Sequence, residues 1–251
     1  MKKLITLLLA GFLSYALASE ITVKVGSENA YKPFTYVDEN GVSTGFDNDL
    51  VRLLAKIDGG IKLEFVPVPW NSIFVGLDSK KFDLIANQIA KNPTREEKYL
   101  FAKEPYSYGK SVLIVKDGSS INSAADLKGK TVGTSVGSNH SANIEKFAKA
   151  HPELNIKLKY YKGYLSILQD LANGRVDAMV NDPLVAIDLA KKQNVNIKIT
   201  DEVFEKTPSF LLFRKGDEEL ANRLDAALIK AKESGELSAL SIKYFGIDLT
   251  K

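Results

Sequence analysis

Segments typical of strands alternate with segments typical of helices along almost the whole chain, and this alternation restricts the fold more than any other feature. Alternating β-branched residues predict a strand at 21–27, and apolar residues at helical spacing predict a helix at 46–57. The second half repeats the order, with a helix predicted at 164–174 and a buried strand at 176–182. Strands and helices in this order predict βαβ units and mainly parallel sheets, and therefore an α/β fold.

An internal match suggests that the two halves are related. WNSIFVGLDSKKFDLIANQ (70–88) aligns without gaps to YLSILQDLANGRVDAMVND (164–182), with five identities in nineteen columns. The alternative is that any helix followed by a strand shares this apolar spacing. If the halves are related, Gln88 and Asp182 occupy equivalent places just after a strand. Ligands of open α/β sheets bind at the carboxyl ends of strands, so both residues become candidates for a binding site.

The N-terminal segment is predicted to be a signal peptide and not part of the fold. Lys2 and Lys3 precede an apolar run at 4–13, and the sequence ALA at 16–18 fits a small-x-small cleavage site. A membrane anchor is the alternative, but the run is shorter than the ~20 residues that a span requires. We therefore expect residues 1–18 to be removed by cleavage.

The composition narrows the chemistry further. The chain has no cysteine and two histidines, which excludes disulfides, thiolate metal sites, cysteine nucleophiles and lipid attachment through cysteine. Loss of Lys2 and Lys3 lowers the basic residues from 34 to 32 against 31 acidic residues, a net charge of about +1. Such a chain without a basic stripe has no footprint for nucleic acid. We expect an unlipidated protein of a Gram-negative periplasm, with no metal site and no cofactor.

Further segments, taken in order, point to one family. They are VGSENAYKPFTY, GFDNDLVRLLAKI, FDLIANQI with a following arginine, PYSYGKSVLIVK, DLKGKTVGTSVGSN, LANGRVDAMVND and LSALSIKYFG. In these segments the chain resembles the periplasmic polar amino-acid-binding proteins, which are the solute-binding components of ABC importers. ANQI…REEKYLFAKEPYS and VGSNHSANI are most similar to the cystine- and cysteine-binding branch of that family.

The resemblance implies a type II periplasmic-binding-protein clamshell. Such a protein has two lobes, each a mainly parallel sheet flanked by helices, with the ligand between them and two hinge crossovers. In this chain lobe 1 would comprise 19–106 plus 202–251, and lobe 2 would comprise 107–201. The crossovers would lie near 105–109 and near 200–203.

The resemblance also implies partners for the charged groups of a free amino acid. Arg95 matches the family arginine that holds the ligand carboxylate, a task that suits the parallel donors of a guanidinium. From its position alone, Arg95 could instead form a surface ion pair with the two glutamates that follow it. Asp182 matches the acidic residue that binds the ammonium group, and Glu28 is a second acidic candidate. Asp182 could also cap the helix that starts at Pro183.

Aromatic and helix-terminal residues complete the expected site. Tyr31 and Trp70 match family positions that pack on the ligand side chain, although each could equally belong to the core. Gly137, Ser138 and Asn139 begin a predicted helix, where free N–H groups attract anions. They would hold part of the ligand or only cap the helix.

One position departs from the family pattern. Many members carry threonine or serine where this chain has Ala90, and that hydroxyl helps to hold the carboxylate. Ala90 keeps its backbone N–H as a donor, and Gln88 or Lys91 would compensate for the missing hydroxyl. His140, beside the predicted helix start, is expected to be structural or exposed.

The implied function is capture of a free polar amino acid, with cystine or cysteine favoured, for delivery to an inner-membrane ABC permease. The expected partner set is a small amino acid and that permease, with the protein itself a monomer and not an enzyme. One alternative is a dehydratase of the prephenate or arogenate type on the same scaffold, with Glu28 or Asp182 as general acid. Another is a sensory protein that presents its ligand to a receptor.

Overall fold

The computed structural model describes residues 20–251, and the predicted signal peptide at 1–18 lies outside the described residues. Residues 20–251 form a mixed α/β fold with one nine-stranded sheet and one three-stranded sheet. Between residues 20 and 251 no helix is both long enough and apolar enough to cross a bilayer.

The secondary structure follows the alternation expected from the sequence. The strands are β1 (Ile21–Glu28), β2 (Ala30–Tyr31), β3 (Thr35–Val37), β4 (Ser43–Thr44), β5 (Ile61–Val68), β6 (Leu84–Ile89), β7 (Tyr99–Phe101), β8 (Ser107–Lys116), β9 (Thr131–Ser135), β10 (Lys157–Tyr161), β11 (Ala178–Asn181) and β12 (Ile197–Arg214). The α-helices are α1 (Phe46–Asp58), α2 (Ile73–Asp78), α3 (Pro93–Lys98), α4 (Asn139–Ala150), α5 (Tyr164–Ala172), α6 (Pro183–Gln193), α7 (Glu218–Glu233) and α8 (Glu236–Phe245). Short 3₁₀ turns are η1 (Trp70–Ser72), η2 (Ala124–Leu127) and η3 (Pro152–Leu154).

The large sheet is mixed and not mainly parallel. Its strand order is β10-β9-β11-β8-β12-β6-β1-β5, with β7 also paired to β12. The pairs β1–β5, β1–β6, β9–β10 and β9–β11 are parallel, whereas β8 and β12 are antiparallel to each of their neighbours. The prediction of mainly parallel sheets is therefore wrong for the middle of the sheet. The physical reason is that β8 carries the chain away from the first strands and β12 returns it alongside, so the two must run in opposite directions.

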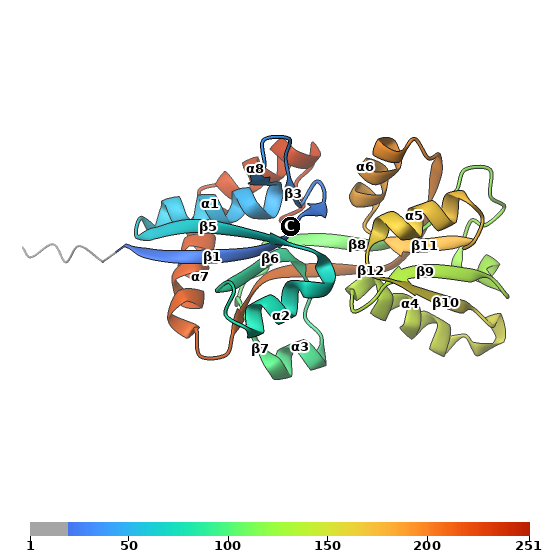
Figure 1. Ribbon diagram of the computed structural model, residues 1–251, viewed down its shortest axis with the longest axis horizontal. Coiled ribbons are helices and arrows are strands. Elements are labelled where there is room, and N and C mark those ends of the chain that lie inside the picture. Colours follow the sequence, from blue (N-terminus) through green and yellow to red (C-terminus); the bar gives the residue numbers. More distant parts are fainter. Residues whose placement is uncertain (1–19) are drawn as a thin grey trace, which may run out of the picture.

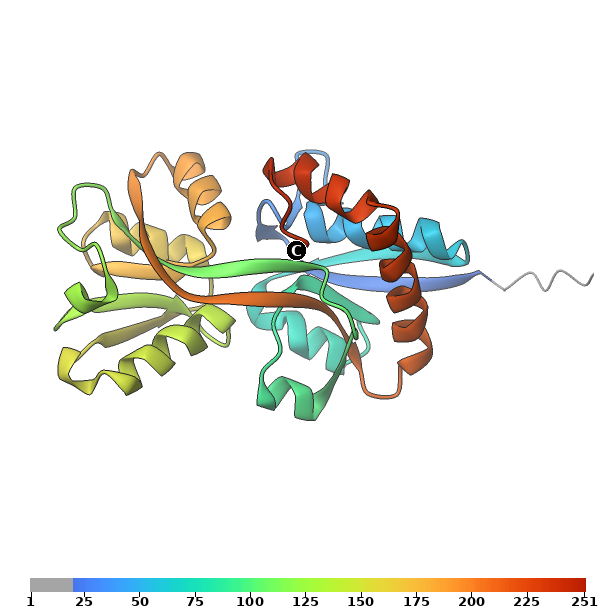
Figure 2. The same cartoon turned by 180° about the vertical axis from the view of Figure 1, so that it is seen from behind.

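Two groups of elements lie at the ends of the long strands β8 and β12 (Figures 1 and 2). The helices α1, α2, α3, α7 and α8 gather around β1, β5 and β6, whereas α4, α5 and α6 gather around β9, β10 and β11. β12 pairs with β8 from Ile197 to Ser209 and then with β6 and β7 from Phe210 to Arg214. Both groups therefore share one continuous pair of strands.

Apolar residues at helical spacing pack α1 onto its neighbours, as the sequence predicts. Leu50 and Leu54 of α1 belong to the same buried cluster as Leu224 and Leu228 of α7, and all four are at most 1% exposed. Burial of a leucine side chain contributes roughly 1.5–3 kcal/mol, so this contact holds the C-terminal α7 against the first group of strands.

Pro93 directly after Asn92 predicts the start of a helix, and the short helix α3 begins there. Pro93 is its first residue, and the Asn92 side chain accepts a hydrogen bond from the Arg95 backbone N–H at 2.8 Å. The cap sets the direction in which α3 leaves β6, and therefore the direction of the Arg95 side chain.

Both segments of the internal match fold as a helix followed by a strand. Residues 70–88 form η1, α2 and most of β6, and residues 164–182 form α5 and β11. Asp182 follows β11 directly, as predicted, whereas Gln88 lies inside β6 and not after it. A common origin of the halves stays a prediction.

Candidate functional site

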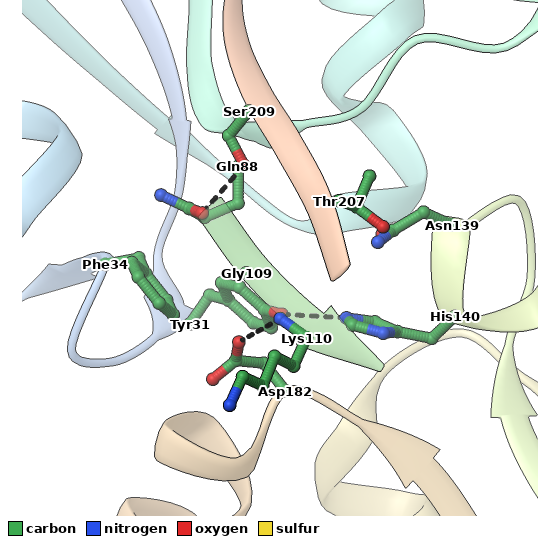
Figure 3. Close-up of a pocket in the computed structure, with 10 residues that line it drawn as sticks. All are labelled: Tyr31, Phe34, Gln88, Gly109, Lys110, Asn139, His140, Asp182, Thr207 and Ser209. Carbon is green, nitrogen blue, oxygen red and sulfur yellow. Dashed lines mark hydrogen bonds between the residues drawn. The ribbon is translucent and has the colours of Figure 1, made fainter. Parts of the chain in front are cut away.

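A small cavity lies beside β8 and β12, where the two groups of elements meet (Figure 3). Its lining residues are Tyr31, Phe34, Gln88, Gly109, Lys110, Asn139, His140, Asp182, Thr207 and Ser209. Its volume of ≈ 20 Å³ is about enough for one water molecule. Residues from seven separate elements or loops thus converge on one small space.

A larger cavity of ≈ 940 Å³ opens nearby and is lined by two further predicted contacts, Glu28 and Trp70, whereas Ala90, Arg95, Gly137 and Ser138 line neither cavity. Glu28, Trp70 and Tyr164 line it, together with the charged residues Lys32 and Asp188. The internal match aligns Trp70 with Tyr164, and the structure brings both aromatic rings to the same cavity.

The two cavities share one aromatic contact. Tyr31, which lines the small cavity, packs on Tyr164 with ring centres 5.6 Å apart.

Arg95 is buried and reaches from α3 to the segment before α4. The residue is 6% exposed, and it donates to the carbonyl oxygens of Ala90 and Gly137, each at 2.8 Å. Its guanidinium carbon lies 5.0 Å from the ring centre of Phe74 and 5.9 Å from that of Trp70. Burial lowers the pKa of Arg95 to about 10. Within residues 20–251 it forms no ion pair, so the alternative of a surface pair with its neighbouring glutamates is wrong.

Trp70 makes a second contact with the same turn. Its Nε1–H donates to the carbonyl oxygen of Val136 at 2.9 Å. Val136 directly precedes Gly137, whose carbonyl oxygen accepts from Arg95. Gly137 has a φ of +72°, a left-handed conformation that turns these two carbonyls toward the first group of elements. Arg95 and Trp70, from the group of elements around β1, β5 and β6, therefore donate to consecutive carbonyl oxygens of the other group.

Asp182 combines a capping role with a place in the small cavity. Its Oδ1 accepts from the Leu184 N–H at 2.8 Å, which confirms the predicted helix cap, and its Oδ2 lies 3.4 Å from the Lys110 N. Burial raises the pKa of Asp182 to about 6, against the opposing effect of the N–H donors. A weakly bound carboxylate oxygen thus faces the cavity, where it would be available to a cationic group.

Glu28 ends β1 as a second buried carboxyl group. It is 7% exposed, and burial raises its pKa to about 7. The Asn87 Nδ2 donates to it at 3.4 Å, while the Asn87 Oδ1 accepts from the Glu28 N–H at 2.6 Å and from the Thr35 hydroxyl at 2.9 Å. The carboxyl group therefore has little local compensation for its charge.

The Tyr164 ring lies among all three charged candidates. Burial raises the pKa of its hydroxyl well above the usual value. The negative charges of Glu28 and Asp182 raise that pKa further, and the positive charge of Arg95 lowers it. One guanidinium and two carboxyl groups are thus near a single aromatic ring.

Tyr31 and His140 meet between the two groups of elements. The Tyr31 hydroxyl lies 3.3 Å from His140 Nε2 (Figure 3). It also donates to Asn181 Oδ1 at 3.4 Å. The His140 Nδ1 lies 2.7 Å from the Ser111 Oγ. Burial lowers the pKa of His140 to about 3, so the ring is neutral. His140 lines the cavity and is not exposed, which corrects one of the two expectations for it.

The remaining predicted residues lie at the edges of this arrangement. Ala90 is 2% exposed and offers its carbonyl oxygen to Arg95, while Gly137 offers its own. Ser138 caps α4 by accepting from the Ser141 N–H at 3.0 Å, and Asn139 lines the small cavity.

Several lining residues have no signal in the sequence. Gly109 and Thr207 pair in the register of β8 and β12, which places them side by side at the cavity. Lys110 and Ser209 flank them on the same two strands. Only the pairing of these distant strands brings the four residues together. Phe34 lies in the quoted segment around Tyr31 but resembles an ordinary core residue.

Comparison with known proteins places these features in a family. Residues 23–247 match the family described as bacterial extracellular solute-binding proteins, family 3. The chain is 38% identical over 230 residues to the L-cystine-binding protein TcyA of Bacillus subtilis, which covers 90% of this chain and 82% of that protein. It is 35% identical over 232 residues to the L-cystine-binding protein TcyJ of Escherichia coli K12, covering 92% and 85%. A solved structure of an ancestral arginine-binding protein bound to arginine superposes with a TM-score of 0.80 at 36% identity, covering 90% and 98%.

Proposed function

Because the chain belongs to the bacterial extracellular solute-binding proteins of family 3, we propose that it captures a free amino acid and delivers it to an ABC permease of the inner membrane. The observation that carries the proposal is Arg95, a buried guanidinium without a carboxylate partner in residues 20–251. The buried carboxyl groups of Glu28 and Asp182 share the Tyr164 surroundings with it. A zwitterion supplies a charge opposite to each of these groups.

Each site residue has a role in this proposal. Arg95 pairs with the ligand carboxylate through its guanidinium fork, and Asp182 accepts from the ammonium group with the oxygen that does not cap α6. Glu28 is a second acceptor for an ammonium group. Tyr31 and Trp70 pack against the ligand side chain. The Ser138 segment adds N–H donors at the start of α4.

The proposed mechanism is closure of two lobes around the ligand. Lobe 1 comprises 19–106 plus 202–251 and lobe 2 comprises 107–201, joined by the shared strands β8 and β12. The contacts of Arg95 and Trp70 with the turn before α4 are support for a closed arrangement. Since the small cavity holds about one water molecule, entry of an amino acid requires these contacts to open. Ligand then shifts the open–closed equilibrium through contacts made only in the closed state.

L-Cystine is the proposed ligand. TcyA and TcyJ, the relatives described above, are named for L-cystine binding. L-Cystine carries two amino-acid heads, and the larger cavity of ≈ 940 Å³ continues from Tyr164 with charges of both signs, including Lys32 and Asp188, which form an ion pair at 3.5 Å that a second head would have to replace. Room and mixed charge beyond the first head suit a long zwitterion better than free cysteine.

The relatives are binding proteins of transport systems, and the chain is not an enzyme. The dehydratase alternative is therefore set aside. We further propose that the protein acts as a monomer in the periplasm, after removal of the signal peptide and without lipidation.

Mass spectrometry of ligand released from gently purified protein tests the proposal, followed by isothermal titration with L-cystine, L-cysteine, L-arginine and L-glutamine. We expect L-cystine to be released and to bind most tightly. Release of another amino acid would reassign the ligand. Absence of binding to any free amino acid would overturn the proposed function.

A further inference from the structure

The strand β6 is irregular at Gln88. β12 pairs Phe210 with Ile89 but Leu212 with Ile85, so β6 has two extra residues between these pairs. Gln88 lies in this bulge with a φ of +49°, a left-handed conformation that is rare for residues other than glycine. A bulge turns a side chain in a new direction and removes a backbone N–H from the ladder, so the N–H of Gln88 requires another acceptor.

Asp47 supplies that acceptor from the first turn of α1. It is fully buried, and its Oδ2 accepts from the Gln88 N–H at 2.8 Å and from the Tyr106 hydroxyl at 2.9 Å. Its Oδ1 accepts from the Gln88 Nε2 at 2.7 Å. One carboxylate therefore fixes both the backbone and the side chain of Gln88.

The other end of the Gln88 amide reaches the two long strands. Its Oε1 accepts from the Ser209 hydroxyl at 2.8 Å (Figure 3). It also accepts from the Ser107 hydroxyl at 3.2 Å. Ser107 and Ser209 are partners in the register of β8 and β12. The Gln88 amide thus connects α1 to both shared strands at the edge of the small cavity.

The polarity of this network is determined by its chemistry. A carboxylate only accepts, so the NH₂ group of Gln88 faces Asp47, where it also lies 3.1 Å from the Ser107 Oγ, and its carbonyl oxygen accepts from the serine hydroxyls. Burial raises the pKa of Asp47 to about 7, while the donors from Gln88 and Tyr106 lower it. Within residues 20–251 Asp47 has no salt bridge. Its buried negative charge is therefore stabilised only by N–H and O–H donors that point toward it.

We propose that Asp47 is a positioning residue for ligand binding, because it holds the Gln88 bulge from which the chain continues to Ala90 and Arg95. This inference rests on the proposed function. Asp47 lines neither cavity and acts through Gln88, which lines the small one. Reversal of the polarity of the Asp47–Gln88 pair provides a direct test.

The test compares Q88E with the double variant D47N/Q88E. Q88E puts a second carboxylate where Gln88 Nε2 now lies, 2.7 Å from Asp47 Oδ1, and the two charges repel. D47N then restores a donor toward the new carboxylate, and its remaining oxygen still accepts the backbone N–H of residue 88. Ser107 and Ser209 continue to donate, so only the orientation of the pair is exchanged.

Isothermal titration with L-cystine and urea unfolding are measured for each variant. We expect Q88E to weaken L-cystine binding by about tenfold or more, which is the loss of one hydrogen bond to a charged group. We expect D47N/Q88E to return to within about threefold of wild type, since the bond between residues 47 and 88 is remade with donor and acceptor exchanged, and the Ser107 and Ser209 hydroxyls still donate to residue 88. Binding by D47N/Q88E no tighter than by Q88E overturns the proposal.

D225N is the matched control. Asp225 is a buried carboxylate of α7 that accepts from the Lys103 N–H at 3.0 and 3.1 Å, and it lines neither cavity. We expect D225N to lower the urea midpoint with no change in L-cystine affinity. An equal loss of affinity in D225N and Q88E would mean that general destabilisation, and not positioning, weakens binding.

If wild type does not bind L-cystine, the proposed ligand fails while Asp47 is still tested by amide hydrogen exchange, which requires no ligand. We expect D47A to accelerate exchange of the residue 88 amide by roughly tenfold, since the N–H loses one of its two buried acceptors and keeps only the Tyr106 hydroxyl at 2.9 Å. Exchange in β1 should be unchanged. Unaltered exchange at residue 88 overturns the positioning role independently of the ligand.

Discussion

Replacement of Arg95 by alanine should weaken ligand binding by roughly 10²-fold with little effect on the fold. Burial lowers the Arg95 pKa from 12.5 to about 10. At 1.36 kcal/mol per unit, the charged form is disfavoured by about 3 kcal/mol in the ligand-free arrangement. A ligand carboxylate that pairs with Arg95 offsets this cost, whereas R95A has neither the cost nor the gain.

The expected loss of affinity follows from the same free energy. Loss of about 3 kcal/mol corresponds to a roughly 10²-fold weaker affinity. At a ligand concentration of 100 times the wild-type Kd, wild type gains about 2.7 kcal/mol from binding, and a variant with a 10²-fold higher Kd gains about 0.4 kcal/mol. For a protein of this size 1 kcal/mol changes Tm by roughly 2–4 °C, so the ligand shift falls from about 5–10 °C to about 1 °C.

Differential scanning fluorimetry with and without L-cystine measures both shifts. K98A is the matched control on the same helix, since Lys98 is exposed and forms a surface ion pair with Asp78 at 2.7 Å. We expect K98A to keep the full ligand shift. A ligand shift in R95A equal to that of wild type would refute the assignment of Arg95 to the ligand carboxylate.

Three further predictions concern the cavity, pH and the fold. G109A places a Cβ 3.4 Å from the Asp182 Oδ2, which is an ordinary contact, so we expect an unchanged Tm. The methyl group takes up ligand space, so we expect the affinity for L-cystine to fall by about tenfold. Unchanged affinity in calorimetry would contradict this. Burial raises the pKa of Glu28 and of Asp47 to about 7, so the ligand-free fold should lose stability in urea titrations as pH rises from about 6.5 to 8, above the range in which the lowered pKa of His140 acts in the opposite direction. Affinity for the ammonium group should increase over the same range, and the opposite slopes would contradict this. R223A removes the ion pair between Arg223 of α7 and Asp58 of α1. This loss should lower the free energy of unfolding by about 1 kcal/mol, or the Tm by roughly 2–4 °C, with no change in affinity. A changed affinity would show that the ion pair also affects the ligand site.

Local features of the fold could be predicted from the sequence because their causes lie within a few residues. The Asn92 cap and Pro93 start of α3 depend on neighbouring backbone groups, and the apolar stripe of α1 depends on helical spacing. The capping role of Asp182 could likewise be predicted, because it depends only on the residues that follow. The family resemblance added the choice of Arg95 over an ordinary surface arginine.

The rest of the candidate site depends on contacts between distant segments. Gly109 and Thr207 line the cavity only because β8 and β12 pair in one register, and no local pattern specifies that register. Burial of His140 likewise depends on Tyr31 from the other group of elements. Of the two outcomes that the sequence left open for His140, structural or exposed, the tertiary structure selects the buried one.

By itself, the sequence determined the α/β class, the positions of most strands and helices, and the residue types available to hold a zwitterion. The tertiary structure decided that the sheet is mixed, that Arg95 is buried against the Gly137 carbonyl, and that Asp47 holds the bulge at Gln88. Propensity, capping and periodicity act over a few residues, whereas strand register and the burial of charge depend on segments far apart in the chain. The residue types of this site can therefore be read from local sequence, whereas their arrangement in space depends on packing between distant segments.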